Sequence, residues 1–298
     1  MARKVDLISE EIAALRLGDD GTPAATDRIR RALQSGEQRM IVAAAQLAGR
    51  SGDVDLVGDL TEGFERLLAG GQVADPVCLA KEAVLAALTE LGHDDPDVYV
   101  RGMTVRQFDP VFGGQEETAG AVRSISVLKL PTTGLNNEDL VRALGLMMFD
   151  SSAHVRQNVV RALGASGSWE AILLIEVKLA AGDAEPGVLG ECFLELLNAD
   201  ISRHLPVVTG YLSHSDLEVR VQAICTLTEC RSVLGVEALI ASFIPSTDWG
   251  DLEQTYLAFG RSRHETAADY LKERLANGSK LESDLAVRAL AQLGREKP

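Results

Sequence analysis

Histidine next to an acidic residue is the feature of this sequence best suited to metal chemistry. One His-Glu dipeptide occurs, His264-Glu265, and the other four histidines are followed by Asp, Val, Leu and Ser. A metal site needs several nitrogen and oxygen ligands that converge on one point. One dipeptide does not supply them, so the sequence predicts no metal site.

The cysteines are the second group of candidates for chemistry, at Cys78, Cys192, Cys225 and Cys230. They lie in apolar stretches without the CxxC spacing of zinc sites and redox motifs. Cys225 and Cys230 are five positions apart, which places them on different sides of a helix. We therefore expect buried free thiols rather than disulfides or metal ligands.

Short catalytic and nucleotide-binding motifs are absent from the sequence. It contains no GxxxxGK[ST], GxGxxG, GxSxG or HExxH. Nucleotide binding, lipase-type hydrolysis and zinc-protease chemistry therefore have no sequence support. Because no catalytic residue can be named, we expect a protein that is not an enzyme and that uses no cofactor.

One stretch differs from the Ala- and Leu-rich sequence on either side of it: HDDPDVYVRGMTVRQFDPVFGGQEETAG, from His93 to Gly120. Its apolar residues do not keep a helical spacing, and its prolines and its Gly-Gly pair would interrupt a helix. The part VYVRGMTVRQF alternates around Gly102, so we expect an extended segment, a short hairpin that turns near Arg101-Gly102. Residues 93–116 are therefore predicted to be an irregular insertion.

The elements on either side of this stretch follow a repeat, which is clearest in the second half of the chain. Similar segments begin at Val155, Val188, Val219, Asp251 and Leu285, and the residue eight positions later is large and apolar in each. The starts are 33, 31, 32 and 34 residues apart. A period in this range is typical of a solenoid of helix pairs.

The first half fits the pattern at wider intervals. Matching helices begin at Arg39, Ala80 and Gly120, and the spacings of 41, 40 and 35 residues indicate inserted sequence. Second helices are predicted around 53–69, 136–148, 169–181, 201–213, 233–244 and 265–276. The sequence thus predicts one all-α solenoid domain over 1–298, with about seven to eight helix pairs and with the insertion in place of one outer helix.

Charged residues at the helix starts predict a structural ladder. Asp150, Asp183 and Asp216 are 33 residues apart and precede inner helices, while Arg156 and Arg220 fall in the first turn. An acid at a helix start is favoured by the helix dipole and can accept hydrogen bonds from the arginine of the next repeat.

This D-x-x-x-x-V-R…A-L-G pattern resembles the HEAT repeat, especially the short bacterial form known from phycobilin-lyase-like proteins. The resemblance covers residues 150–294 well and the rest of the chain weakly. It implies a curved α-solenoid that binds other macromolecules on its concave face, and it carries little information about activity.

Enzymes with HEAT-like folds provide the alternative hypothesis. Deoxyhypusine hydroxylase holds two irons with several His-Glu dipeptides, and DNA glycosylases of this type need a basic groove, whereas this chain has a net charge of −15. Trp169 and Trp249 each open a predicted outer helix, where they would cover a neighbouring repeat. No signature of a tetrapyrrole pocket supports a phycobilin-lyase-like role. A cofactor-handling protein or enzyme on this frame remains the second reading.

The overall composition agrees with a helical, acidic protein. Hydrophobic residues make up 46% and aromatic residues 4%, and most apolar residues are Ala, Leu and Val, which favours stacked helices over a β-sandwich. The acidic balance argues against general nucleic-acid binding. Because the sequence shows no signal region and no run of 18 apolar residues, we expect a cytoplasmic protein without membrane segments.

The main functional prediction is a non-catalytic scaffold or adaptor that binds a protein partner through its concave face and the 93–116 insertion. Aromatic residues, Met and Arg are enriched at the centre of interfaces. The partner-binding residues are predicted to be Tyr99, Arg101, Arg106, Phe108 and Phe112. Alternatively, the apolar residues of the insertion fold back and fill the gap left by the missing helix. The charged C-terminal helix is typical of a solenoid cap, which favours a monomer.

Overall fold

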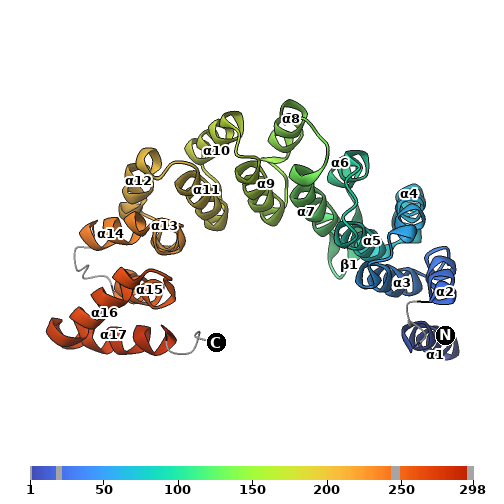
Figure 1. Ribbon diagram of the computed structural model, residues 1–298, viewed down its shortest axis with the longest axis horizontal. Coiled ribbons are helices and arrows are strands. Elements are labelled where there is room, and N and C mark those ends of the chain that lie inside the picture. Colours follow the sequence, from blue (N-terminus) through green and yellow to red (C-terminus); the bar gives the residue numbers. More distant parts are fainter. Residues whose placement is uncertain (1, 18–21, 243–248, 294–298) are drawn as a thin grey trace. The chain divides into compact units, whose positions relative to one another are not determined.

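The structure is a computed structural model that describes residues 2–17, 22–242 and 249–293. These residues form seventeen α-helices, four short 3-10 helices and one two-stranded sheet. Helices that follow one another pack together, which confirms the predicted all-α, solenoid-like fold (Figure 1). The chain divides into two compact units, Met1–Ala162 and Leu163–Pro298.

The first unit consists of two layers of helices. Its helices are α1 (Ala2–Leu17), α2 (Pro23–Leu33), α3 (Gln38–Ser51), α4 (Val57–Ala74), α5 (Leu79–Glu90), α6 (Pro96–Thr104), α7 (Gly120–Lys129) and α8 (Asn137–Met147), with 3-10 helices η1 (Val54–Leu56), η2 (Pro76–Cys78) and η3 (Leu130–Thr132) between some of them. Helices α3, α5 and α7 form an inner layer, and α2, α4 and α6 pack against it as an outer layer (Figure 1). Helix α9 (Ala153–Ser166) crosses into the second unit.

The second unit repeats this arrangement. Its helices are α10 (Trp169–Ala181), α11 (Pro186–Ala199), α12 (Ile201–Gly210), α13 (Leu217–Glu229), α14 (Val233–Ser242), α15 (Trp249–Arg261), α16 (Glu265–Asn277) and α17 (Lys280–Leu293), and η4 (Tyr211–Ser213) follows α12. Helices α11, α13, α15 and α17 pack in succession, and α10, α12, α14 and α16 cover them. All eight predicted inner helices are present. The end of the predicted 233–244 helix lies outside the described residues.

Small side chains allow the inner helices to approach one another closely. Ala44, Ala45 and Ala48 of α3 are fully buried where this helix packs on α5. At the end of α3, a Cβ on Gly49 would lie 2.1 Å from Oε2 of Glu90, so the carboxylate occupies the space that a side chain would take. The glycine that ends several repeats therefore has a packing role, since interiors are filled to near-crystalline density.

Residues 93–116 contain an outer helix that the sequence analysis missed. Helix α6 packs on α7, so the insertion does not replace an outer helix. Pro96 is the first helical residue, where its missing N–H would have had no helical partner, and the Asp95 side chain caps the N–H of Asp97. Gly102 lies against Ser126, where a Cβ would meet Oγ at 2.1 Å. Neither residue breaks the helix.

A hairpin does follow, later in the chain than predicted. Strands β1 (Phe108–Val111) and β2 (Gly114–Glu117) are antiparallel, and Val111 pairs with Gly114. The turn is formed by Phe112 and Gly113, and the φ of 94° at Gly113 is a conformation that glycine adopts without strain. Strand β1 lies beside η2, next to the inner layer (Figure 1). The prediction of a turn at Arg101-Gly102 was wrong.

Two further expectations concern tryptophan and the membrane. Trp169 is 72% exposed and does not cover a neighbouring repeat, which corrects the prediction. Trp249 is the first residue of α15, which is an inner helix and not an outer one as predicted; the surroundings of its side chain lie outside the described residues. Among the described helices, none has both the length and the apolar character needed to cross a bilayer.

Candidate functional site

The five predicted partner-binding residues have three kinds of environment. Tyr99 is buried, Arg101 and Arg106 form ion pairs with other helices or loops, and Phe108 and Phe112 are exposed. Tyr99 is 0% exposed, and its hydroxyl donates a hydrogen bond to the carbonyl oxygen of His93 at 3.1 Å. It is part of the core beneath α6 and does not reach the surface. Arg101 is exposed and forms an ion pair with Glu65 of α4, so it joins two outer helices.

Phe108 and Phe112 are the two residues of this set that present apolar surface. Phe108 is 53% exposed and Phe112 is fully exposed, and Val111 between them is also exposed. We call Phe108, Val111 and Phe112 together the hairpin tip; Val111 and Phe112 lie at the turn, and Phe108 lies at the start of β1, opposite Glu117. Three large apolar side chains exposed within five consecutive residues are a candidate contact surface for a partner.

The base of the hairpin is held on one side by a buried polar network. The Lys81 ammonium donates to Oδ2 of Asp75 and to Oε1 of Gln107, both at 3.1 Å. The Gln107 amide donates in turn to the Asp75 carbonyl and to Oδ2 of Asp109, both at 2.9 Å. Thr118 closes the network with a hydrogen bond to the same Asp109 oxygen. The start of α5 and both ends of the hairpin are thereby joined.

Hydrogen bonding controls the charge of Asp109 in this network. The bonds from Thr118 and Gln107, helped by the Val77 N–H, lower the pKa of Asp109 from 3.8 to about 2. Asp109 is buried, so the negative charge of its carboxylate depends on these donors.

The segment beside β1 has a strained backbone. Val77 and Cys78 have φ angles of 53° and 59°, and they are the two non-glycine residues with positive φ in the described chain. This region is costly for a β-branched side chain, and such residues cluster at functional sites. Here the conformation directs the Val77 N–H to Asp109, and it leaves the Val77 side chain partly exposed.

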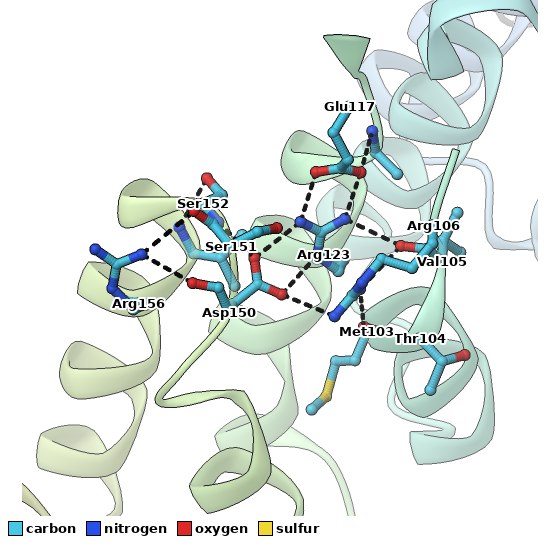
Figure 2. A network of polar contacts seen from close by, with 12 residues as sticks. Met103, Thr104, Val105, Arg106, Glu117, Arg123, Asp150, Ser151, Ser152 and Arg156 are labelled. Atoms are coloured by element: carbon cyan, nitrogen blue, oxygen red, sulfur yellow. Dashed lines mark hydrogen bonds and ion pairs between the residues drawn. The ribbon is translucent and has the colours of Figure 1, made fainter. Parts of the chain in front are cut away.

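A second buried network lies on the other side of the hairpin, around Arg123 of α7 (Figure 2). Its Nη1 and Nη2 donate to Oε1 and Oε2 of Glu117, both at 2.7 Å. Its Nε and Nη2 donate to Oδ2 and Oδ1 of Asp150 at 3.0 and 2.8 Å. The remaining N–H binds the carbonyl of Val105 at 3.0 Å. All five N–H donors of a buried guanidinium are therefore satisfied.

The charges of this network follow from the same contacts. Burial opposes the Arg123 charge, but the hydrogen bonds with Glu117 and Asp150 outweigh it and raise the pKa of Arg123. The bonds from Arg123 lower the pKa of Glu117. Glu117 is the last residue of β2, so this ion pair fixes the hairpin to α7.

Arg106 extends the network to the end of α6. Its Nη2 donates to Oδ2 of Asp150 at 2.9 Å, and its Nη1 donates to the carbonyl of Val105 at 3.0 Å (Figure 2). The second contact satisfies a carbonyl at the C-terminus of a helix. Arg106 is half-exposed, yet its guanidinium is committed to these acceptors.

The ladder residues lie at helix starts, with partners that differ from those predicted. Asp150 accepts from Arg123 on the preceding inner helix, whereas the prediction had an arginine of the next repeat. Arg156 and Arg220 make the same kind of contact, a hydrogen bond of 2.8 Å to the main-chain carbonyl six positions earlier. Arg156 donates to the carbonyl of Asp150, and Arg220 donates to that of His214.

The three acids have different neighbours despite their equal spacing. Asp183 forms a buried ion pair with Lys178 at 2.8 Å. Asp216 is the N-cap of α13 and accepts from the N–H of Glu218 at 2.8 Å. Asp150 precedes its helix by three positions and Asp216 by one, so the 33-residue spacing does not make them equivalent.

Sequence reasoning missed the pairs Asp75 with Lys81 and Glu117 with Arg123, although a signal was present. In each pair the basic residue follows the acid by six positions, as Arg156 follows Asp150. The acids lie before α5 and α7, and the bases lie in the first turn of these helices. A search for this spacing in the first half would have found both pairs.

A groove runs along the inner helices of the first unit. One part, of about 520 Å³, lies between α3 and α5 and is lined by Arg50, Glu82 and Glu90 above an alanine-rich floor. A second part, of about 370 Å³, lies between α1 and α3 and is lined by Arg16 and Arg39. Both parts share three lining residues, Val42, Gln46 and Leu79. Leu79, which directly follows η2, lines both parts, so the groove passes the segment that contacts β1.

The cysteines and histidines are distributed through the fold. All four cysteines are free, with Cys78, Cys192 and Cys230 buried and Cys225 half-buried, which agrees with the predicted free thiols. Burial raises the pKa of the Cys192 thiol to about 12. In the described part of the chain, no three His, Cys, Asp or Glu side chains are grouped as a metal would need.

Comparison with protein-family models and with curated proteins gives no match. No protein-family model matches the chain, and no curated protein matches it in sequence. The function must therefore be inferred from the residues and their arrangement.

Proposed function

We propose that this protein is a non-catalytic adaptor with a HEAT-like solenoid fold, and that it binds a protein partner through the hairpin tip and the adjoining groove of the first unit. The repeat spacing and the two layers of helices support the HEAT-like assignment. The observation that carries the functional proposal is the exposure of Phe108, Val111 and Phe112 on a hairpin whose base is fixed by buried ion pairs.

Exposed apolar residues on a rigid support bind with a small entropic penalty. A two-stranded hairpin of this length is at best marginally stable by itself. Here Glu117 is held by Arg123, and Asp109 is held by Gln107 and Thr118, so the two strands keep one position. A surface ordered before binding loses less conformational freedom when the partner arrives.

The two networks also explain why the hairpin tip has not folded back onto the core. Asp109 and Glu117 face buried donors, and these contacts fix the base of both strands. Tyr99 and Met103 of the insertion are buried in α6, as the gap-filling alternative expected, whereas Phe108 and Phe112 are exposed.

A photo-crosslinking experiment tests the proposal. The full chain with p-benzoylphenylalanine in place of Phe112 is produced in its own cells, irradiated, and the linked protein is identified and purified. The purified partner is then titrated against the wild-type chain and against Phe108→Ser/Phe112→Ser. We expect the double variant to bind at least about tenfold more weakly, as for removal of a central anchor pair.

Trp169→Ser is the matched control, because it removes an exposed aromatic residue from the second unit. It should bind the partner as the wild type does. Equal binding by wild type and double variant, or an equal loss in the Trp169 variant, would contradict the proposal.

A further inference from the structure

The hairpin has one open edge, and the register identifies it. The N–H of Thr118 donates to the carbonyl of Gln107 at 2.9 Å, so these residues form a hydrogen-bonded pair. Such pairs alternate with pairs whose backbone groups point away from the ladder. The outward-pointing residues are therefore Phe108 and Pro110 on β1 and Gln115 and Glu117 on β2.

The two edges differ in their ability to accept another strand. On β1, Pro110 has no N–H, and η2 already lies beside this strand. On β2, residues 114–116 are exposed, and the backbone N–H and C=O groups of Gln115 and Glu117 have no hydrogen-bond partner in the described part of the chain. An exposed edge of this kind is a template for a further strand.

The chemistry of β2 restricts what can be added. Its sequence is GQEE, and neither strand of the hairpin contains a basic residue. The Glu116 side chain is exposed, and it has no ion pair among the described residues. A segment that pairs with β2 would therefore be favoured by Lys or Arg next to Glu116, because opposite charges on neighbouring strands attract.

The two faces of the hairpin then define a pattern in the partner. Phe108, Gln115 and Glu117 project to one face, and Val111 and Glu116 project to the other, since side chains alternate along a strand. Because Arg123 neutralises Glu117, Glu116 carries the free negative charge of β2. We propose that β2 binds an extended segment of the partner as a third strand, in which apolar residues on the Phe108 face alternate with basic residues on the Glu116 face. This rests on the proposed function and specifies the chemistry of the partner.

Strand addition would use contacts that an apolar patch alone lacks. Main-chain hydrogen bonds to Gln115 and Glu117 supply affinity that does not depend on side-chain identity, and the alternating side chains supply selectivity. The rigid attachment of Glu117 to Arg123 fixes the edge before the segment arrives. The short length of β2 limits the added strand to a few residues.

The test measures peptide binding to the full chain by fluorescence anisotropy. The probes are labelled ten-residue peptides in which Val alternates with Lys, Val alternates with Glu, or Val alternates with Lys but prolines interrupt the middle. We expect the Val/Lys peptide to bind at least about tenfold more tightly than either of the others. Equal binding of the three peptides, or binding of none, would overturn the proposal.

Two variants separate strand addition from adhesion to the hairpin tip. Gln115→Pro removes an outward N–H while the hydrogen bonds of the hairpin remain, and it should weaken Val/Lys binding about tenfold or more, whereas Gln115→Thr should not. Glu116→Lys should reverse the preference in favour of the Val/Glu peptide. Amide exchange protection across the hairpin verifies that each variant is folded.

The outcomes for this inference and for the proposed function differ. If Phe108→Ser/Phe112→Ser loses the crosslinked partner while Gln115→Pro keeps both the partner and the peptide, then the adaptor function stands and strand addition is wrong. If the double variant keeps the partner, the adaptor function at the hairpin tip is itself wrong. Loss of peptide binding in Gln115→Pro, with binding kept in Gln115→Thr, supports the third strand.

Discussion

Arg123 and Asp150 form a bidentate ion pair in which both side chains are completely buried. Other N–H groups of the same guanidinium bind Glu117. The pair connects α7 with the loop before α9, and Glu117 connects it with the hairpin (Figure 2). One side chain thus positions three segments of the first unit.

Replacement of Arg123 by Ala should destabilise the first unit strongly. It leaves the carboxylates of Glu117 and Asp150 without their main partner, and loss of one member of a buried pair typically costs about 3–5 kcal/mol. Denaturation followed by circular dichroism measures the change in the free energy of unfolding. The control is Arg101→Ala, which removes an exposed ion pair with Glu65 and should change stability by less than about 1 kcal/mol. Similar effects of the two substitutions would contradict the role of Arg123.

Acid should loosen the hairpin through Asp109. Its folded pKa of about 2 is depressed below the ordinary 3.8, so its stabilising effect is complete above about pH 4 and is lost as the pH falls toward 2. Glu117 acts in the same direction because its pKa is also lowered. Amide exchange of the hairpin residues, measured from pH 5 down to 2, should show protection falling in this window.

The substitution Asp109→Asn provides the control for the acid effect. It removes one titrating group, so the remaining pH dependence of hairpin protection should be shallower than in the wild type. A profile identical to that of the wild type would show that Asp109 does not titrate in this window and would refute the assignment.

The helical repeat could be predicted from sequence because it depends on local periodicity. An inner helix buries apolar residues at helical spacing in every repeat, and all eight starts recur in the structure. The period alone does not report which residues contact each other between repeats. Asp150 and Asp216 are therefore separated by two exact periods and still occupy different positions relative to their helices.

Helix α6 was missing from the sequence prediction because Pro96 and Gly102 were treated as helix breakers without regard to their positions in the helix. Val98, Tyr99, Gly102 and Met103 are buried, a spacing that a helix produces and a strand does not. Pro96 at the first helical position permits the helix. Once the helix is recognised, the burial of Tyr99 follows. Of the other predicted partner-binding residues, Arg101, Phe108 and Phe112 are exposed and Arg106 is half-exposed.

A close backbone contact between two inner helices of the second unit gives a final prediction, at Gly260 of α15. A Cβ there would lie 2.7 Å from the carbonyl oxygen and 3.0 Å from Cα of Ala289 in α17. Both are backbone atoms, which cannot rotate away as the Glu90 carboxylate can beside Gly49. Gly260→Ala should therefore force α15 and α17 apart and lower the free energy of unfolding by about 1–3 kcal/mol, a typical effect of overpacking.

Gly58→Ala in α4 separates this effect from helix propensity. No atom lies within 4 Å of a Cβ at Gly58, so the substitution adds only the propensity gain of alanine over glycine, which is up to about 1 kcal/mol in favour of folding. Thermal and denaturant unfolding of both variants should thus show shifts of opposite sign. A stabilising Gly260→Ala would mean that α15 and α17 are separated widely enough to accept a methyl group, and the tight packing described for this pair would be incorrect.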